Sequence, residues 1–94
     1  MKTHELKILP QYFEAVQSKD KCFEIRKDDR AFAVGDKLIL KEYEKDGKRG
    51  GKYTGRTCER FVQYIHHGTG EFGLAEGFCV LGLSQNACDK YRPT

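Results

Sequence analysis

The chain has 94 residues, of which 38% are hydrophobic and 33% charged, and its formal net charge is +3. This length fits a single domain over residues 1–94, and the composition is typical of a folded protein with a well-solvated surface. No apolar run approaches the roughly 20 residues that cross a bilayer and the first residues lack a signal peptide, so we expect a cytoplasmic protein without a membrane partner.

The first predicted element is a strand at Thr3–Leu9, where buried-type and polar residues alternate. Pro10 stops this strand, and proline is favoured in the first turn of a helix. A short helix is therefore predicted over Pro10–Ser18. Its apolar stripe consists of Tyr12, Phe13 and Val16.

A second strand is predicted at Lys21–Lys27, because the residues alternate again. Phe23 and Ile25 fall on one face of this strand, whereas Glu24 and Arg26 fall on the other. The pattern places two charged side chains next to each other on the same face.

Ala33-Val34-Gly35-Asp36 reads as a turn that leads into a strand at Lys37–Tyr43. Several glycines follow between Glu44 and Gly55, with Asp46-Gly47 as a turn signal, and they predict a long hairpin connection. The return strand is predicted at Arg56–His66.

On the return strand, the alternation places Cys58, Val62 and Tyr64 on the face opposite to Phe61 and Ile65. Three phenylalanines of the predicted strands are interpreted as core residues: Phe23, Phe61 and Phe78.

Residues 67–77 are rich in glycine and predict a loop with one helical turn, followed by a last strand at Phe78–Ser84 and a mobile tail after about residue 84. Short strands, an early helix and glycine-rich loops favour a mainly β (α+β) fold. We expect a rolled antiparallel sheet or small barrel, since closure removes exposed edges.

Four cysteines are spread widely along the chain: Cys22, Cys58, Cys79 and Cys88. This spacing lacks the density of a secreted disulfide scaffold and indicates reduced thiols. The sequence contains no Cys-x-x-Cys or His-x-x-x-His pair, so we expect no metal site and no cofactor. The adjacent His66 and His67 point to opposite faces of a strand and make a poor chelating pair.

The basic residues gather in one segment, Lys45–Arg56, where Asp46 is the sole acid. A basic hairpin of this kind suits a phosphate backbone, with an aromatic ring available to stack on a base. A glycine-rich tip kept soluble by lysine explains the same residues without a function. The candidate contacts are Lys48, Arg49, Lys52 and Tyr53.

Four stretches taken together resemble a known family: His4-Glu5-Leu6-Lys7, Phe23-Glu24-Ile25-Arg26-Lys27, Arg30 with Val34-Gly35-Asp36, and Gly77 to Leu83. The resemblance covers His4 to Leu83 and is to the ASCH branch of the PUA-like superfamily, most closely the phage- and bacteria-associated DUF 3850 group. It implies a pseudo-β-barrel of five to six strands with one or two short helices and a cleft beside the early helix. This chain reads Ser18-Lys19-Asp20-Lys21 where a generic ASCH sequence often has Gly-x-Lys.

The resemblance implies a cleft lined by Lys21, Glu24, Arg26 and Arg30 that binds RNA or a nucleotide-like ligand. Arg binds phosphate in a bidentate manner, and Glu accepts from an exocyclic amine. The alternative is a same-face Glu24–Arg26 ion pair of little consequence.

Two further candidate binding sites can also be interpreted without a function. The charged run from Lys27 to Arg30 reads as a lip of the cleft or as a solvated turn. His66 reads as a hydrogen-bonding group in the cleft or as a strand-end histidine.

The predicted function is therefore RNA or nucleotide binding without catalysis. One alternative is a small hydrolase of a modified nucleoside, because some ASCH proteins resemble amidohydrolases that use a Lys, Thr and Glu set. Lys21 matches the lysine, but Glu24 stands where the threonine belongs, so we expect no turnover of acetylcytidine. Thr54 or Thr57 could supply the hydroxyl only with special geometry, and both Glu71 and Glu76 are possible matches for the downstream glutamate. A further alternative is a phage or bacterial protein-interaction module.

Overall fold

The structure, a computed structural model, describes residues 1–86 and consists of five strands, one α-helix and two single turns of 3-10 helix. The elements in chain order are β1 (Thr3–Ile8), α1 (Pro10–Gln17), β2 (Phe23–Lys27), β3 (Lys37–Lys45), η1 (Gly47–Arg49), β4 (Gly51–His67), η2 (Glu71–Gly73) and β5 (Phe78–Ser84). The predicted mainly β class and early helix are confirmed. Most of the predicted mobile tail lies outside the described residues.

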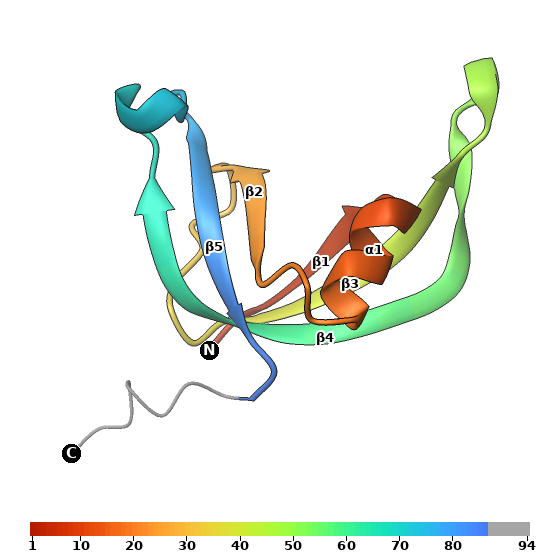
Figure 1. Cartoon of the computed structure of the whole chain (residues 1–94), viewed down its shortest axis with the longest axis horizontal. Helices are drawn as coiled ribbons and strands as arrows, with labels where there is room; N and C mark the ends of the chain where they lie inside the picture. The colour runs from red at the N-terminus through yellow and green to blue at the C-terminus, as the bar shows by residue number, and fades with distance from the viewer. Residues whose placement is uncertain (87–94) are drawn as a thin grey trace.

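The five strands form one curled sheet in the order β1-β3-β4-β5-β2. The β1–β3 pair is parallel, whereas β3–β4, β4–β5 and β5–β2 are antiparallel. Figure 1 shows β4 crossing the bottom of the view and curving upward at both sides. Helix α1 lies inside the right-hand part of this curve, and β2 lies beside β5 inside the left-hand part. The result is a half-barrel whose edge strands are β1 and β2.

The predicted long connection between Glu44 and Gly55 is wrong, because β3 and β4 remain paired almost to the tip. Tyr43 pairs with Tyr53 across the strands, and their ring centroids are 5.1 Å apart. A Cβ atom at Gly51 would clash with the carbonyl oxygen of Glu44 and the ring of Tyr43. This glycine therefore permits close strand pairing instead of marking a loop.

The predicted faces of β4 are wrong beyond Val62. The register with β5 shifts between Val62 and Tyr64, as it does at a β-bulge. As a result, Val62 is fully buried while Tyr64 is 64% exposed, and Ile65 packs against the core. A bulge reverses the alternation beyond it, so a single period-2 pattern could not describe the whole strand.

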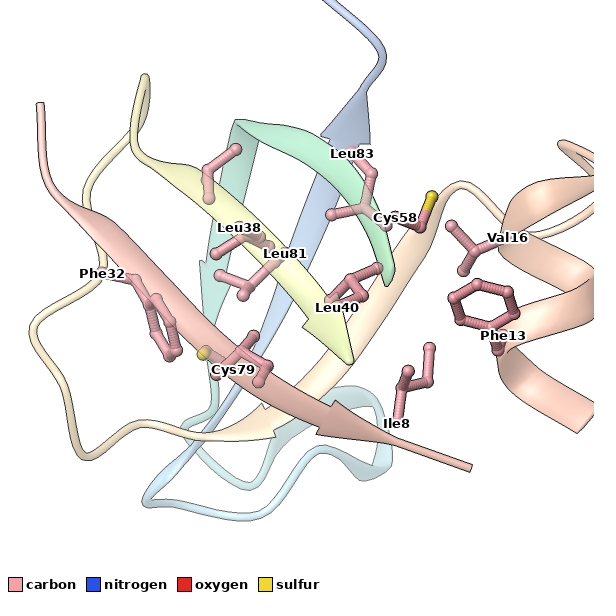
Figure 2. Close-up of a cluster of buried hydrophobic side chains, with 12 residues drawn as sticks. Ile8, Phe13, Val16, Phe32, Leu38, Leu40, Cys58, Cys79, Leu81 and Leu83 are labelled. Carbon is pink, nitrogen blue, oxygen red and sulfur yellow. The ribbon is translucent and has the colours of Figure 1, made fainter. Parts of the chain in front are cut away.

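The core fills the concave side of the curled sheet, and α1 covers one end of it. Figure 2 shows Leu40 of β3 near Phe13 and Val16 of α1. The buried phenylalanines are Phe13 and Phe32. The interpretation of Phe23 and Phe78 as core residues is wrong, because they are 42% and 40% exposed. Their backbone positions put them on the outer face of the sheet.

The side chain of Asp36 stabilises the Val-Gly-Asp turn before β3. Its buried carboxylate accepts hydrogen bonds from the backbone N–H groups of Lys2 and Ala33, both at 3.0 Å, and lies 2.8 Å from Nε2 of His4. Gly35 has a φ of 94°, which glycine adopts without strain. Burial pushes the pKa of Asp36 up, but these hydrogen bonds together outweigh it and hold the pKa below its ordinary value.

Asp36→Asn is expected to lower the free energy of unfolding at neutral pH by about 2 kcal/mol, because hydrogen bonds to a charged group are lost. A carboxylate with a depressed folded pKa stabilises above the unfolded pKa of about 3.9, and this contribution disappears as the pH falls through the folded pKa. Urea unfolding between pH 7 and pH 2 should therefore show a smaller acid-induced loss in the variant than in the wild type. Asp46→Asn, at the exposed hairpin tip, is the matched control. Equal acid sensitivity of the wild type and Asp36→Asn would contradict this role.

Candidate functional site

The main pocket lies where the two edge strands of the half-barrel face each other. It has a volume of about 430 Å³ and is bounded by β1 and the start of α1 on one side and by β2 on the other. A fully closed barrel would have paired strands here. The lining residues are Lys7, Ile8, Leu9, Tyr12, Lys21, Phe23, Glu24, Ile25 and Arg26. We call this the seam pocket.

Glu24 provides the buried charge of the seam pocket, with 3% of the residue exposed. Nζ of Lys21 donates to Oε1 of Glu24 at 2.5 Å, and Nε of Arg26 donates to Oε2 at 3.0 Å. Two cations thus hold one carboxylate in a fixed orientation. The sequence-predicted cluster of Lys21, Glu24 and Arg26 is brought together at one site.

Two exposed aromatic rings flank this charged cluster. Nζ of Lys21 lies 4.7 Å from the ring centroid of Tyr12 and 5.4 Å from that of Phe23. Both distances allow cation–π attraction. Because Tyr12 is 47% and Phe23 is 42% exposed, the rings remain accessible beside a polar centre.

Arg26 also bridges the open seam. Its Nη2 donates to the carbonyl oxygen of Lys7 on β1 at 2.7 Å. Arg30, from the loop after β2, donates through Nη1 to the carbonyl oxygen of Glu5 at 2.8 Å. Both carbonyls lie on the free edge of β1, so the two arginines fasten the loop and β2 to that edge. Both arginines therefore have a structural role, and their role as ligand contacts stays a prediction.

Lys27 and Arg30 do not line the seam pocket. They lie at a smaller neighbouring pocket of about 120 Å³, which Arg26 also lines. Arg30 is 3.7 Å from the carboxylate of Asp29, with both side chains about half exposed. The charged run is therefore adjacent to the seam pocket, and Arg26 lines both pockets; its role as a lip of the cleft stays a prediction.

The basic hairpin lies apart from the seam pocket. Lys48 and Arg49 form η1 at the tip, and Lys52 pairs with Glu44 across the strands. Tyr53 packs edge-to-face on Tyr43 and lies below Nζ of Lys41, 4.7 Å from the ring centroid. None of the four candidate hairpin residues lines the seam pocket.

Arg56 lies on β4 and contacts α1 instead of the hairpin tip. Its guanidinium carbon lies 4.6 Å from the ring centroid of Phe13, and Nη2 is 2.8 Å from the carboxylate of Glu14. It also lies 3.7 Å from the buried Glu42, which accepts a hydrogen bond from Thr54. These contacts hold α1 against the sheet and account for one of the basic residues of the segment.

His66 is outside the seam pocket as well. Its ring centroid is 6.4 Å from that of Phe72, in the loop between β4 and β5. The neighbouring His67 lies 2.7 Å from a carboxylate oxygen of Asp28 and is largely exposed. Neither histidine faces the Lys21–Glu24 pair as an acid or base would need to do.

Two of the three cysteines in the described part of the chain are shielded from reaction, whereas Cys22 is exposed. Cys58 and Cys79 are buried, and burial raises the pKa of both thiols, with Asp28 adding to the effect at Cys79. Within residues 1–86, no three His, Cys, Asp or Glu side chains are grouped as metal ligands. No helix of this part of the chain has the length and hydrophobicity needed to cross a membrane.

Sequence reasoning missed the apolar and aromatic walls of the pocket. Tyr12 was assigned to the buried stripe of the helix, and Phe23 to the core. The available signal was the helical spacing itself, since Phe13 and Val16 suffice for a narrow stripe and Tyr12 lies outside it. On β2, the buried Glu24 forces its neighbours Phe23 and Ile25 to the opposite face.

These features define a small half-barrel β domain with a polar and aromatic pocket between its edge strands. Residues 3–83 match the family described as "Domain of unknown function (DUF3850)", and the chain belongs to this family. It is also similar to the "Uncharacterized 12.9 kDa protein in GpA 3'region" of Escherichia phage P2, with 41% identity over 58 residues. That match covers 62% of this chain and 49% of the phage protein, so the chain spans about half the length of this relative.

Proposed function

We propose that this chain is a PUA-like domain of the ASCH type that binds RNA or a nucleotide-like ligand in the seam pocket without chemistry. One observation carries the proposal: two cations hold a buried carboxylate, and one of these cations, Lys21, lies against two exposed aromatic rings. This combination offers hydrogen bonds in a defined direction together with stacking surfaces. A flat, polar-edged ring such as a nucleobase matches both.

The seam pocket offers contacts for both the ring faces and the polar edge of a base. Tyr12 and Phe23 offer ring faces, and stacking on an aromatic side chain is worth about 1–3 kcal/mol per base. Glu24 accepts from an exocyclic amine, and Arg26 has N–H groups beyond those that contact Glu24 and Lys7. Ile8, Leu9 and Ile25 give the pocket an apolar wall, as is usual for small-ligand sites.

A longer RNA would gain contacts outside the pocket. Figure 1 shows the β3–β4 hairpin extending on the side of α1, away from β5 and η2. Its tip carries Lys48 and Arg49, which would contact phosphates without reading sequence. The positive charge of the hairpin tip thus raises the affinity for RNA, whereas the seam pocket selects the base that is bound.

The test is equilibrium binding of short single-stranded and hairpin RNAs at low and moderate salt. Wild-type binding should be saturable and should weaken as salt rises, because phosphate contacts release counterions. The double variant Tyr12→Ala/Phe23→Ala should bind at least tenfold more weakly, since the loss of stacking exceeds 1.4 kcal/mol. These residues are better targets than Arg26 and Arg30, whose hydrogen bonds to β1 also support the fold.

Tyr64→Ala is the matched control, because Tyr64 is an exposed aromatic residue of β4 that does not line the seam pocket. It should bind RNA as the wild type does. Absence of wild-type binding at low salt, or equal losses in Tyr64→Ala and the double variant, would exclude this function for the seam pocket.

A further inference from the structure

A second pocket adjoins the seam pocket at the C-terminal end of α1. It has a volume of about 240 Å³. Its lining residues are Val16, Lys19, Lys21, Cys22, Arg60, Leu83, Ser84 and Gln85. Lys21 lines both pockets, so they lie on either side of one side chain. Among residues 1–86, three cationic side chains and no acidic one line this pocket.

Arg60 gives this second pocket a fixed positive charge. Its Nη2 donates to the carbonyl oxygen of Val16 at 3.0 Å, and its Nη1 donates to the carbonyl oxygen of Glu59 at 2.7 Å. Both acceptors are carbonyl oxygens, so the guanidinium is held in place without a carboxylate partner among residues 1–86. It also offsets the partial negative charge at the end of α1.

Lys19 adds a second uncancelled charge from an unusual backbone position. It follows the C-cap residue Ser18 and has a φ of 71°, the left-handed conformation in which glycine or asparagine is usual. Within residues 1–86, neither Lys19 nor Arg60 takes part in an ion pair. Asp20 is next to Lys19 in the chain, but its carboxylate accepts from the hydroxyl of Ser18 and does not line the pocket.

We propose that the second pocket binds a phosphate group, so that the ligand of this domain is a phosphorylated nucleotide unit and not a bare nucleoside. The inference rests on the proposed function of the seam pocket and names the chemistry of its ligand. The base lies in the seam pocket, and its phosphate lies between Lys19 and Arg60. Lys21, fixed on Glu24, lies between the two groups. Charge-assisted hydrogen bonds from a lysine and an arginine are the usual means of holding a phosphate.

The experiment measures the affinity of the full chain for the four common ribonucleosides, for their 5′- and 3′-monophosphates, and for inorganic phosphate. At least one monophosphate should bind about tenfold or more tightly than its nucleoside, as expected for one or two charge-assisted hydrogen bonds. Inorganic phosphate should compete with the monophosphate and leave nucleoside binding unchanged.

Lys19→Gly removes the charge and retains the left-handed backbone, so the variant should fold at least as well as the wild type. It should lose most of the monophosphate advantage and keep the nucleoside affinity. Lys2→Gln is the control for a general loss of positive charge, because Lys2 is exposed and lines none of the pockets described above, and it should keep the advantage. Equal affinities for nucleosides and monophosphates, or equal effects of the two variants, would overturn the phosphate site while leaving the base pocket intact. Failure of nucleosides, monophosphates and RNA alike to bind would overturn both proposals.

Discussion

Glu24→Ala is expected to lower the free energy of unfolding by about 3 kcal/mol, because it leaves two cations without their shared carboxylate. Glu24 is 3% exposed, and the side chains of Lys21 and Arg26 are only 18% and 21% exposed. The positive charges of Lys21 and Arg26 would then remain close together, where they are only partly exposed to water. Urea denaturation at neutral pH, followed by circular dichroism, measures the change.

Glu59→Ala is the matched control for this carboxylate. Glu59 forms an ion pair with Lys37 at 3.2 Å, but its side chain is 58% exposed. An exposed pair of this kind contributes at most about 1 kcal/mol. If the two variants lost the same stability, the cluster around Glu24 would not be the buried centre described above.

Phe13→Ala is expected to destabilise the protein by about 3–5 kcal/mol, the usual cost of removing a buried phenylalanine ring. Phe13 is 1% exposed, and the guanidinium of Arg56 lies over its ring. A change of 1 kcal/mol shifts the melting temperature of a domain of this size by about 4–8 °C. Thermal unfolding should therefore show a loss of more than ten degrees.

Tyr12→Ala separates stability from binding, because Tyr12 precedes Phe13 in the same helix and is 47% exposed. It should change the free energy of unfolding by less than about 1 kcal/mol. The same variant should weaken binding of the nucleotide ligand. A large loss of stability in Tyr12→Ala would mean that this ring supports the helix and is not free to stack on a base.

Local patterns were sufficient to predict the α-helix and the order of the strands, but not the start of β4 or the turn η1. Alternation located the strands, with β5 at its observed bounds of Phe78–Ser84, and Pro10 located the start of α1. The helical turn in the loop before β5 is present as η2. These features depend on neighbours in the chain, which a single sequence contains.

Features that depend on distant partners could not be predicted in the same way. The bulge after Val62 and the extended β3–β4 pairing depend on the register between strands. The cluster of Lys21, Glu24 and Arg26 was predicted, since all three belong to one short segment. The resemblance implied a cleft beside the early helix, but the residues of this second wall were not predicted, because they come from β1 and α1 and meet β2 only when the sheet curls.

The fastening of β1 by Arg26 and Arg30 also bears on aggregation. An edge strand with unpaired carbonyl groups is a template on which another chain can add a strand. Here two of those carbonyls, of Glu5 and Lys7, already accept hydrogen bonds from guanidinium groups. An incoming strand would have to displace both arginines and bring its own backbone next to their positive charges. The half-barrel can therefore leave this side of its sheet unpaired while discouraging growth into fibrils.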